Sequence, residues 1–131
     1  MKALDTNVIV RFLLNDDRAQ GRRARRLFED AEESGERFFV TTPVLLETIW
    51  VLSAVYEFSR AEILHALVLL THMPILEFEN YDGTQHLIRL GQSTKADLPD
   101  LLIGVSGRSH GCAATLTFEK RLVQTGLFEP L

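Results

Sequence analysis

The chain has 131 residues, of which 46% are hydrophobic and 24% charged, and its formal net charge is −4. This composition predicts one globular domain over residues 1–131 and argues against a disordered chain. It also argues against a membrane protein, because no apolar run approaches the roughly 20 residues of a membrane span. The single cysteine, Cys112, and an N-terminus unlike a signal peptide predict a cytoplasmic protein.

Short apolar segments that alternate with helical patterns run along the whole chain. Strands are expected at 2–4, 37–40, 75–78 and 113–116, with a weaker one at 128–131. Helices are expected at 8–14, 17–33, 43–56, 60–72, 83–92 and 98–110, and a short one from Phe118. Thr42 before Pro43 predicts a helix cap, and Ser59 with Glu62 has the form of a capping box.

This alternation predicts an α/β fold with a mostly parallel central sheet and helices on both faces, in three layers. In such folds ligands bind beyond the carboxyl ends of the strands. Asp5 and Glu119 each fall just after a predicted strand, and Glu47 and Asp100 fall in the first turns of helices that could start on the same edge. Four carboxylates gathered there would repel one another unless a cation held them, so the pattern predicts a cation site.

Each acid also has a structural explanation that the sequence leaves open. Asp5 could cap the helix that follows it, Asp97 could cap the helix from residue 98, and Glu119 could be an exposed acid beside two basic residues. Glu47 is harder to explain in this way. It interrupts an apolar helix face and has no basic residue within four positions, so burial of its charge would be costly.

Ligands that are all oxygen select hard cations, so Mg²⁺ or Mn²⁺ is expected and not zinc. The four histidines lack metal-ligand spacing. Net charge does not exclude a nucleic-acid partner, because 13 acids face 14 bases once the five acids of the predicted site are set aside. Those five are Asp5, Glu47, Asp97, Asp100 and Glu119. Trp50 and the phenylalanines are expected in the core.

Four segments together resemble the ordered acidic motifs of PIN-domain nucleases. They are Leu4-Asp5-Thr6-Asn7-Val8, Glu47 inside a helix, Ala96-Asp97-Leu98-Pro99-Asp100, and Leu116-Thr117-Phe118-Glu119. In length and compactness the chain is most similar to the toxin ribonucleases of VapBC-type toxin–antitoxin pairs. The resemblance implies a metal-dependent endoribonuclease with a parallel sheet flanked by helices, held inactive by a cognate antitoxin and commonly a homodimer.

The resemblance also implies roles for individual residues. Asp5, Glu47 and Asp100 fall on the family's metal-site acids, and Asp97 matches an accompanying acid. Glu119 stands where the family usually has aspartate, one methylene shorter. The implied catalytic residues are Asp5, Glu47, Asp100 and Glu119, all five acids are implied metal ligands, and Thr6, Asn7 and Thr117 are expected to orient them.

Four arginines at positions 22, 23, 25 and 26 form the one concentrated basic group. Pairing with Glu29 and Asp30 on an exposed helix face explains them equally well. Arginines early and acids late in a helix oppose the helix dipole, however, which favours contact with RNA or an acidic antitoxin. The expected contact residues are Arg11, Arg22, Arg25, Arg108 and Lys120.

The expected reaction is metal-assisted hydrolysis of an RNA phosphodiester by water, which leaves a 5′ phosphate and a 3′ hydroxyl. The alternative is a PIN-like domain that binds RNA or a protein without cleaving it, because Glu119 departs from the family pattern. A dehalogenase-like phosphatase is disfavoured, since Asp5-Thr6-Asn7 lacks the second acid that such an enzyme needs.

Overall fold

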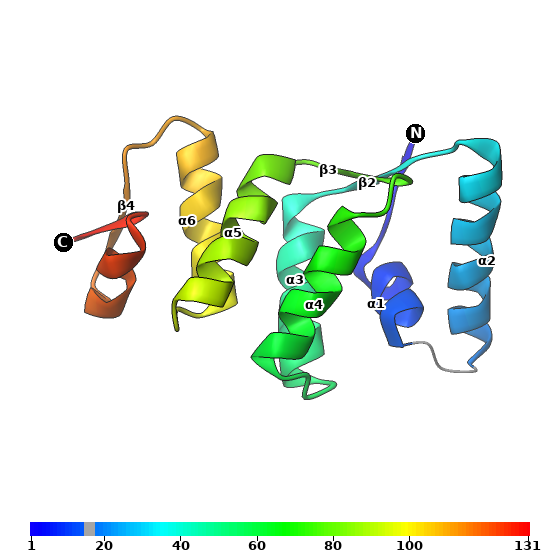
Figure 1. Cartoon of the computed structure of the whole chain (residues 1–131), viewed down its shortest axis with the longest axis horizontal. Helices are drawn as coiled ribbons and strands as arrows, with labels where there is room; N and C mark the ends of the chain where they lie inside the picture. Colours follow the sequence, from blue (N-terminus) through cyan, green and yellow to red (C-terminus); the bar gives the residue numbers. More distant parts are fainter. Residues whose placement is uncertain (15–17) are drawn as a thin grey trace. The chain divides into compact units, whose positions relative to one another are not determined.

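The computed structural model describes residues 1–14 and 18–131 (Figure 1). The chain forms two compact units, Met1–Glu79 (unit 1) and Asn80–Leu131 (unit 2). The predicted α/β class is confirmed, because short parallel strands alternate with helices along the chain. In the part of the chain that is described, no helix has the length and apolar character needed to cross a membrane.

Unit 1 is a three-stranded parallel sheet with four helices. The strands lie in the order β1 (Lys2–Ala3), β2 (Phe38–Val40) and β3 (Leu76–Phe78), and the helices are α1 (Thr6–Leu14), α2 (Ala19–Ser34), α3 (Thr42–Ala54) and α4 (Arg60–Thr71). Figure 1 shows α1 between α2 and the packed pair α3 and α4. The predicted start of the second helix at Asp17 lies outside the described residues.

Helix α2 joins the sheet through an aromatic contact. Its buried residues, Gly21, Ala24, Phe28 and Ala31, recur every three or four positions and therefore form one face. The Phe28 ring lies 4.5 Å from the ring of Phe12 in α1 and 6.3 Å from that of Phe38 in β2, measured between centroids. This single side chain therefore ties two helices to the central strand.

Helix α3 begins with a different cap from the predicted one. The Thr41 hydroxyl accepts a hydrogen bond from the Val44 backbone N–H at 3.4 Å, so Thr41 is the N-cap and Thr42 already lies in the helix. The prediction of Thr42 was wrong because proline fits either of the first two helical positions. The Thr42 N–H is satisfied instead by the Glu79 carboxylate at the end of β3, at 3.0 Å.

The capping box at the start of α4 is confirmed. The Ser59 hydroxyl accepts from the Glu62 N–H at 3.1 Å, and the Glu62 carboxylate accepts from the Ser59 N–H at 2.9 Å. Hydrogen bonding of the Glu62 carboxylate to the Ser59 backbone, and then to the Ser59 side chain, lowers the pKa of Glu62 because it stabilises the ionised form.

Unit 2 contains two helices, a 3₁₀-helix and a second parallel pair of strands. These are α5 (Tyr81–Ser93), α6 (Leu98–Ser109), β4 (Thr115–Thr117), the 3₁₀-helix η1 (Lys120–Thr125) and β5 (Phe128–Pro130). Helix α5 packs against α6. The short helix expected from Phe118 starts two residues later, and the strand expected at 113–116 is shifted to β4.

Two aromatic residues expected in the core are on the surface. Trp50 in α3 is 58% exposed and Phe118 after β4 is 83% exposed. In α3 the buried face is formed by Leu45, Thr48, Ile49 and Leu52, which turns Trp50 outwards. The prediction for these two side chains was therefore wrong.

Helix α6 approaches β5 closely at Gly104. A Cβ atom built at this position would lie 2.8 Å from Phe128 Cε2 and 3.0 Å from Leu127 Cβ. Such distances are shorter than carbon atoms tolerate, so the absence of a side chain lets the helix and the strand pack.

We expect Gly104→Ala to destabilise the protein by about 1–3 kcal/mol, because the added methyl group overpacks this contact. The midpoint of urea unfolding measures the effect. Ser106→Ala in the same helix is the control, with an expected change within about 0.5 kcal/mol. A Gly104→Ala protein as stable as the wild type would contradict the packing of α6 on β5.

The cap of α3 gives a second stability prediction. Thr41→Ala should cost about 1 kcal/mol because the Val44 N–H loses its partner. Thr42→Ala should change stability little, since Thr42 engages Glu79 through its backbone. Urea unfolding of the two variants compares them directly, and an equal loss in both would show that Thr41 is not the cap.

Candidate functional site

The carboxyl ends of β1, β2 and β3 meet at one edge of the sheet in unit 1, because the three strands are parallel. Asp5 follows β1 after one buried residue, Leu4, whose N–H donates to the Phe39 carbonyl at 3.0 Å. Strand β2 leads through Thr41 into α3. The edge therefore carries Asp5 and the start of the helix that holds Glu47.

Asp5 and Glu47 are both exposed in the structure. The prediction that Glu47 interrupts a buried apolar face was wrong, because the buried residues of α3 lie on another side of the helix. Its carboxylate remains in water and carries no burial cost. Glu47 therefore needs no charged partner to keep the fold stable, and the fold alone does not explain why an acid stands at this position.

Thr6 and Asn7, expected to orient the ligands, lie in the first turn of α1. Thr6 is only 3% exposed, and among the described residues its hydroxyl oxygen has no hydrogen-bond partner. A buried hydroxyl without a partner costs about 1–3 kcal/mol. It is the one such hydroxyl found in the described residues, and it directly follows Asp5.

Two of the predicted metal ligands of unit 2 lie at the start of α6. Asp97 occupies the N-cap position, but its side chain makes no capping hydrogen bond. The explanation of Asp97 as a simple helix cap therefore lacks its defining contact. Asp100 lies in the first turn and is half-buried.

The pKa of Asp100 is raised above the ordinary value. Partial burial is the largest cause, followed by the negative charges of Asp97 and Glu119. The N-terminus of a helix favours the ionised form, so these effects outweigh the helix dipole. The charges of Asp97 and Glu119 therefore act on Asp100.

Glu119 follows β4 and pairs with a neighbour in the chain. Its Oε1 lies 3.1 Å from Nε of Arg121, and the two side chains are 50% and 89% exposed. This exposed pair agrees with the simpler explanation of Glu119 as a surface acid, although its charge also reaches Asp100. Thr117, predicted to orient the ligands, accepts a hydrogen bond from the Glu119 N–H at 3.0 Å.

The acids predicted as metal ligands divide between the units. Asp5 and Glu47 belong to unit 1, and Asp97, Asp100 and Glu119 belong to unit 2. Over residues 1–14 and 18–131, no group of three or more His, Cys, Asp or Glu side chains is placed to hold a metal ion. Neither unit therefore gathers a complete ligand set from its own described residues.

The structure shows the surroundings of three residues predicted to contact RNA or a partner, Arg108, Arg11 and Lys120. In Arg108, Nη2 donates to the carbonyls of Ala113 at 3.1 Å and Gly126 at 2.8 Å, so its guanidinium joins α6 to the loops beside β4 and β5. Arg11 lines a cavity together with Asn7. Lys120 is exposed at the start of η1.

The residues expected from the sequence to contact RNA or to form the site did not include Arg23, Arg26 and Glu79. Arg23 and Arg26 line the same cavity as Arg11, whereas contact was predicted for Arg22 and Arg25. The spacing of Arg23 and Arg26 with Leu27, at three and four positions, was the available signal. Glu79 also lies at the carboxyl edge of the sheet, but its carboxylate is used at the start of α3.

Comparisons with known proteins indicate the family of the chain. The sequence is 24% identical to a VapC ribonuclease of Aquifex aeolicus (strain VF5) over 126 residues, which is 96% of this chain and 93% of that protein. No solved structure matches the chain significantly. The sequence model of the PIN domain family matches residues 2–126, which takes in both units and all five acids. The chain therefore belongs to the PIN-domain family.

Proposed function

We propose that this protein is a metal-dependent endoribonuclease, formed by one domain over residues 1–131, and the toxin of a toxin–antitoxin pair. The family match over residues 2–126 carries the proposal, because it spans the ordered acids Asp5, Glu47 and Asp100. The similarity to a protein named VapC ribonuclease supports RNA as the substrate class.

The donor set fits a hard divalent cation, Mg²⁺ or Mn²⁺. Asp5, Glu47 and Asp100 supply carboxylate oxygens, with Asp97 and Glu119 as further ligands. The raised pKa of Asp100 supports this choice, because a cation would relieve the repulsion that Asp97 and Glu119 exert on it. The buried Thr6 hydroxyl beside Asp5 is suited to orient a ligand or a water molecule.

When bound, the cation would lower the pKa of a water molecule and neutralise charge on the scissile phosphate. The carboxylates of Asp5, Glu47 and Asp100 would hold the cation, and Thr6 and Asn7 would orient the chain beside Asp5. The nucleophile is water and not the ribose 2′ hydroxyl. The products are therefore a 5′ phosphate and a 3′ hydroxyl.

The proposal extends to partners and location. A cognate antitoxin would hold the enzyme inactive, a second copy of the chain would complete a homodimer, and the complex would act in the cytoplasm. The exposed apolar side chains of Trp50 in unit 1, and of Leu116 and Phe118 in unit 2, are available for such protein contacts.

A second candidate function is a PIN-domain protein that binds RNA or a protein without cleavage. Two observations favour it. Glu119 is paired with Arg121, and the described residues of neither unit alone gather three ligands. Saturable Mn²⁺ binding that Asp5→Asn or Asp100→Asn abolishes would support the nuclease over this candidate.

Cleavage of single-stranded RNA tests the nuclease directly. We expect Mg²⁺- or Mn²⁺-dependent cleavage that Asp5→Asn and Asp100→Asn each slow by about 10²–10³-fold, because each removes a charge that holds the cation. Mapping of product ends should find 5′ phosphates. Glu33→Gln, an exposed acid near the end of α2, is the matched control and should cleave at the wild-type rate. Cleavage that persists in EDTA or in Asp5→Asn would refute the mechanism.

The stability of the metal-free protein gives an independent prediction. A raised folded-state pKa means that ionised Asp100 destabilises the fold above that pKa, and that the penalty disappears as the pH falls below the ordinary value of 3.8. Asp100→Asn should therefore raise the melting temperature at pH 7 in EDTA, and the gain should vanish in acid. Differential scanning calorimetry from pH 7 down to about pH 3 measures it.

At neutral pH, metal binding should make the wild type more stable than the Asp100→Asn protein. At a hundredfold excess over Kd, Mn²⁺ should stabilise the wild type by about 2.7 kcal/mol. It should leave the Asp100→Asn protein almost unchanged. Equal stabilisation of both proteins would show that Asp100 is not a ligand.

A further inference from the structure

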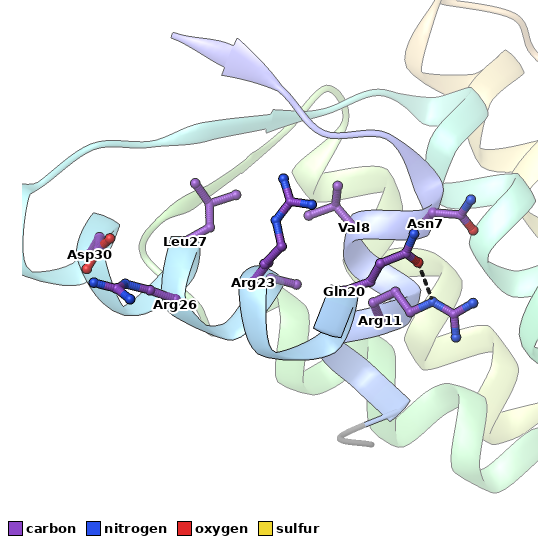
Figure 2. A pocket seen from close by; sticks show the side chains of 9 residues that line it. Asn7, Val8, Arg11, Gln20, Arg23, Arg26, Leu27 and Asp30 are labelled. Atoms are coloured by element: carbon purple, nitrogen blue, oxygen red, sulfur yellow. Dashed lines mark hydrogen bonds between the residues drawn. The ribbon is translucent and has the colours of Figure 1, made fainter. Parts of the chain in front are cut away.

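A surface cavity of about 540 Å³ lies between α1 and α2 in unit 1 (Figure 2). Helix α1 lines it with Asn7, Val8 and Arg11, and helix α2 with Arg23, Arg26 and Leu27 among others. Its volume is within the range of about 300–1,000 Å³ that is typical of small-ligand sites. The cavity is thus large enough for one nucleotide unit.

The described lining residues combine positive charge with apolar surface. Among them, three arginines and one acid, Asp30, give a net charge of +2, while Val8, Ala24 and Leu27 contribute apolar surface. Guanidinium groups bind phosphate through paired N–H donors, and they also stack on bases. The cavity therefore combines the two kinds of contact that a nucleotide needs.

One guanidinium is held in position by the opposite helix. Arg11 Nε donates to Gln20 Oε1 at 3.1 Å, the dashed line in Figure 2. Figure 2 shows this pair at the end of the cavity where Asn7 lies, with Arg26 and Asp30 at the other end. The charged groups thus follow the length of the cavity.

Helix stability does not explain the arginines of α2. The helix has no acid in its first turn and no base in its last turn, which is the reverse of the arrangement that its dipole favours. Arg23 and Arg26 are both exposed. Their positive charge is therefore available to an anionic ligand.

The cavity is adjacent in the chain to the proposed metal ligands. Asn7, which lines it, lies two residues after Asp5 and directly after the buried Thr6. If a strand of RNA cleaved beside Asp5 continues past this first turn of α1, its next nucleotide meets Arg11 and the basic face of α2.

We propose that this cavity binds one nucleotide of the RNA substrate that flanks the cleaved bond. Arg11, Arg23 and Arg26 contact its phosphates, and Val8 and Leu27 pack against its base or ribose. The inference rests on the proposed ribonuclease function and assigns a substrate subsite within it. An acidic protein segment would satisfy the same charges, but it has no need to pass Asp5 and would add carboxylates beside that acid.

Binding of RNA to the full chain tests the subsite separately from catalysis. In an Asp100→Asn background, which prevents cleavage, the Kd of a short fluorescent single-stranded RNA is measured by anisotropy at several salt concentrations. Arg23→Ala and Arg26→Ala should each weaken binding about tenfold, or about 1.4 kcal/mol. Each should also reduce the slope of log Kd against log salt by about 0.7, as expected for one lost phosphate contact.

Arg89→Ala is the control, because it removes the same charge from an exposed arginine of unit 2 that does not line the cavity. It should bind RNA within about twofold of the background protein. Equal affinities of the Arg89, Arg23 and Arg26 variants, with unchanged melting temperatures, would overturn the subsite. Binding of a glutamate-rich peptide that Arg23→Ala abolishes, while RNA binding stays intact, would also overturn the subsite.

The two proposals fail in different ways. Cleavage by the wild type together with normal RNA binding by the Arg23 and Arg26 variants would reject the subsite alone. RNA binding that depends on Arg23 and Arg26, without any metal-dependent cleavage by the wild type, would reject the nuclease and leave an RNA-binding cavity.

Discussion

The parallel pairing of β1, β2 and β3 is the constraint on which the candidate site in unit 1 depends. The strands are two or three residues long, and backbone hydrogen bonds extend the pairing by one residue, from Leu4 to Phe39 and from Glu79 to Val40. Because parallel strands end at one edge, Asp5, the start of α3 and Glu79 lie along it. Strands this short have few hydrogen bonds of their own, so the packing of Phe28 on Phe12 and Phe38 supports the arrangement.

Electrostatics differ between the two groups of acids. In unit 1, Asp5 and Glu47 are exposed, so the fold bears little cost for their charges. In unit 2, partial burial and the charges of Asp97 and Glu119 raise the pKa of Asp100. Repulsion between acids that brings no structural benefit is typical of a functional site. A bound cation would offset the repulsion. Ionised Asp100 thus carries a stability cost that binding of the proposed cation would remove.

Local signals in the sequence were the most reliable guides to structure. The capping box of Ser59 and Glu62 is confirmed because both partners are three residues apart and need no distant contact. The prediction of Thr42 as the cap failed because proline fits either of the first two helical positions, and the Thr42 N–H binds the carboxylate of Glu79, which is distant in sequence. Exposure was predicted least well. Trp50 and Glu47 both seemed to belong to a buried face, whereas the direction in which α3 packs leaves both side chains exposed.

By itself, the sequence determined the α/β class, the order of strands and helices, and the resemblance to the PIN-domain family, which the family match over residues 2–126 confirms. These follow from periodicity and from residue types at fixed spacing, which are properties of short segments. Only the tertiary structure decided which side chains meet. It paired Glu119 with Arg121 and engaged Arg108 with two carbonyls, and it turned Arg23 and Arg26 towards the cavity beside Asn7. The contact of Arg108 with Gly126 and the cavity between α1 and α2 each join separate segments of the chain, and the pattern of one segment does not encode which other segment it meets.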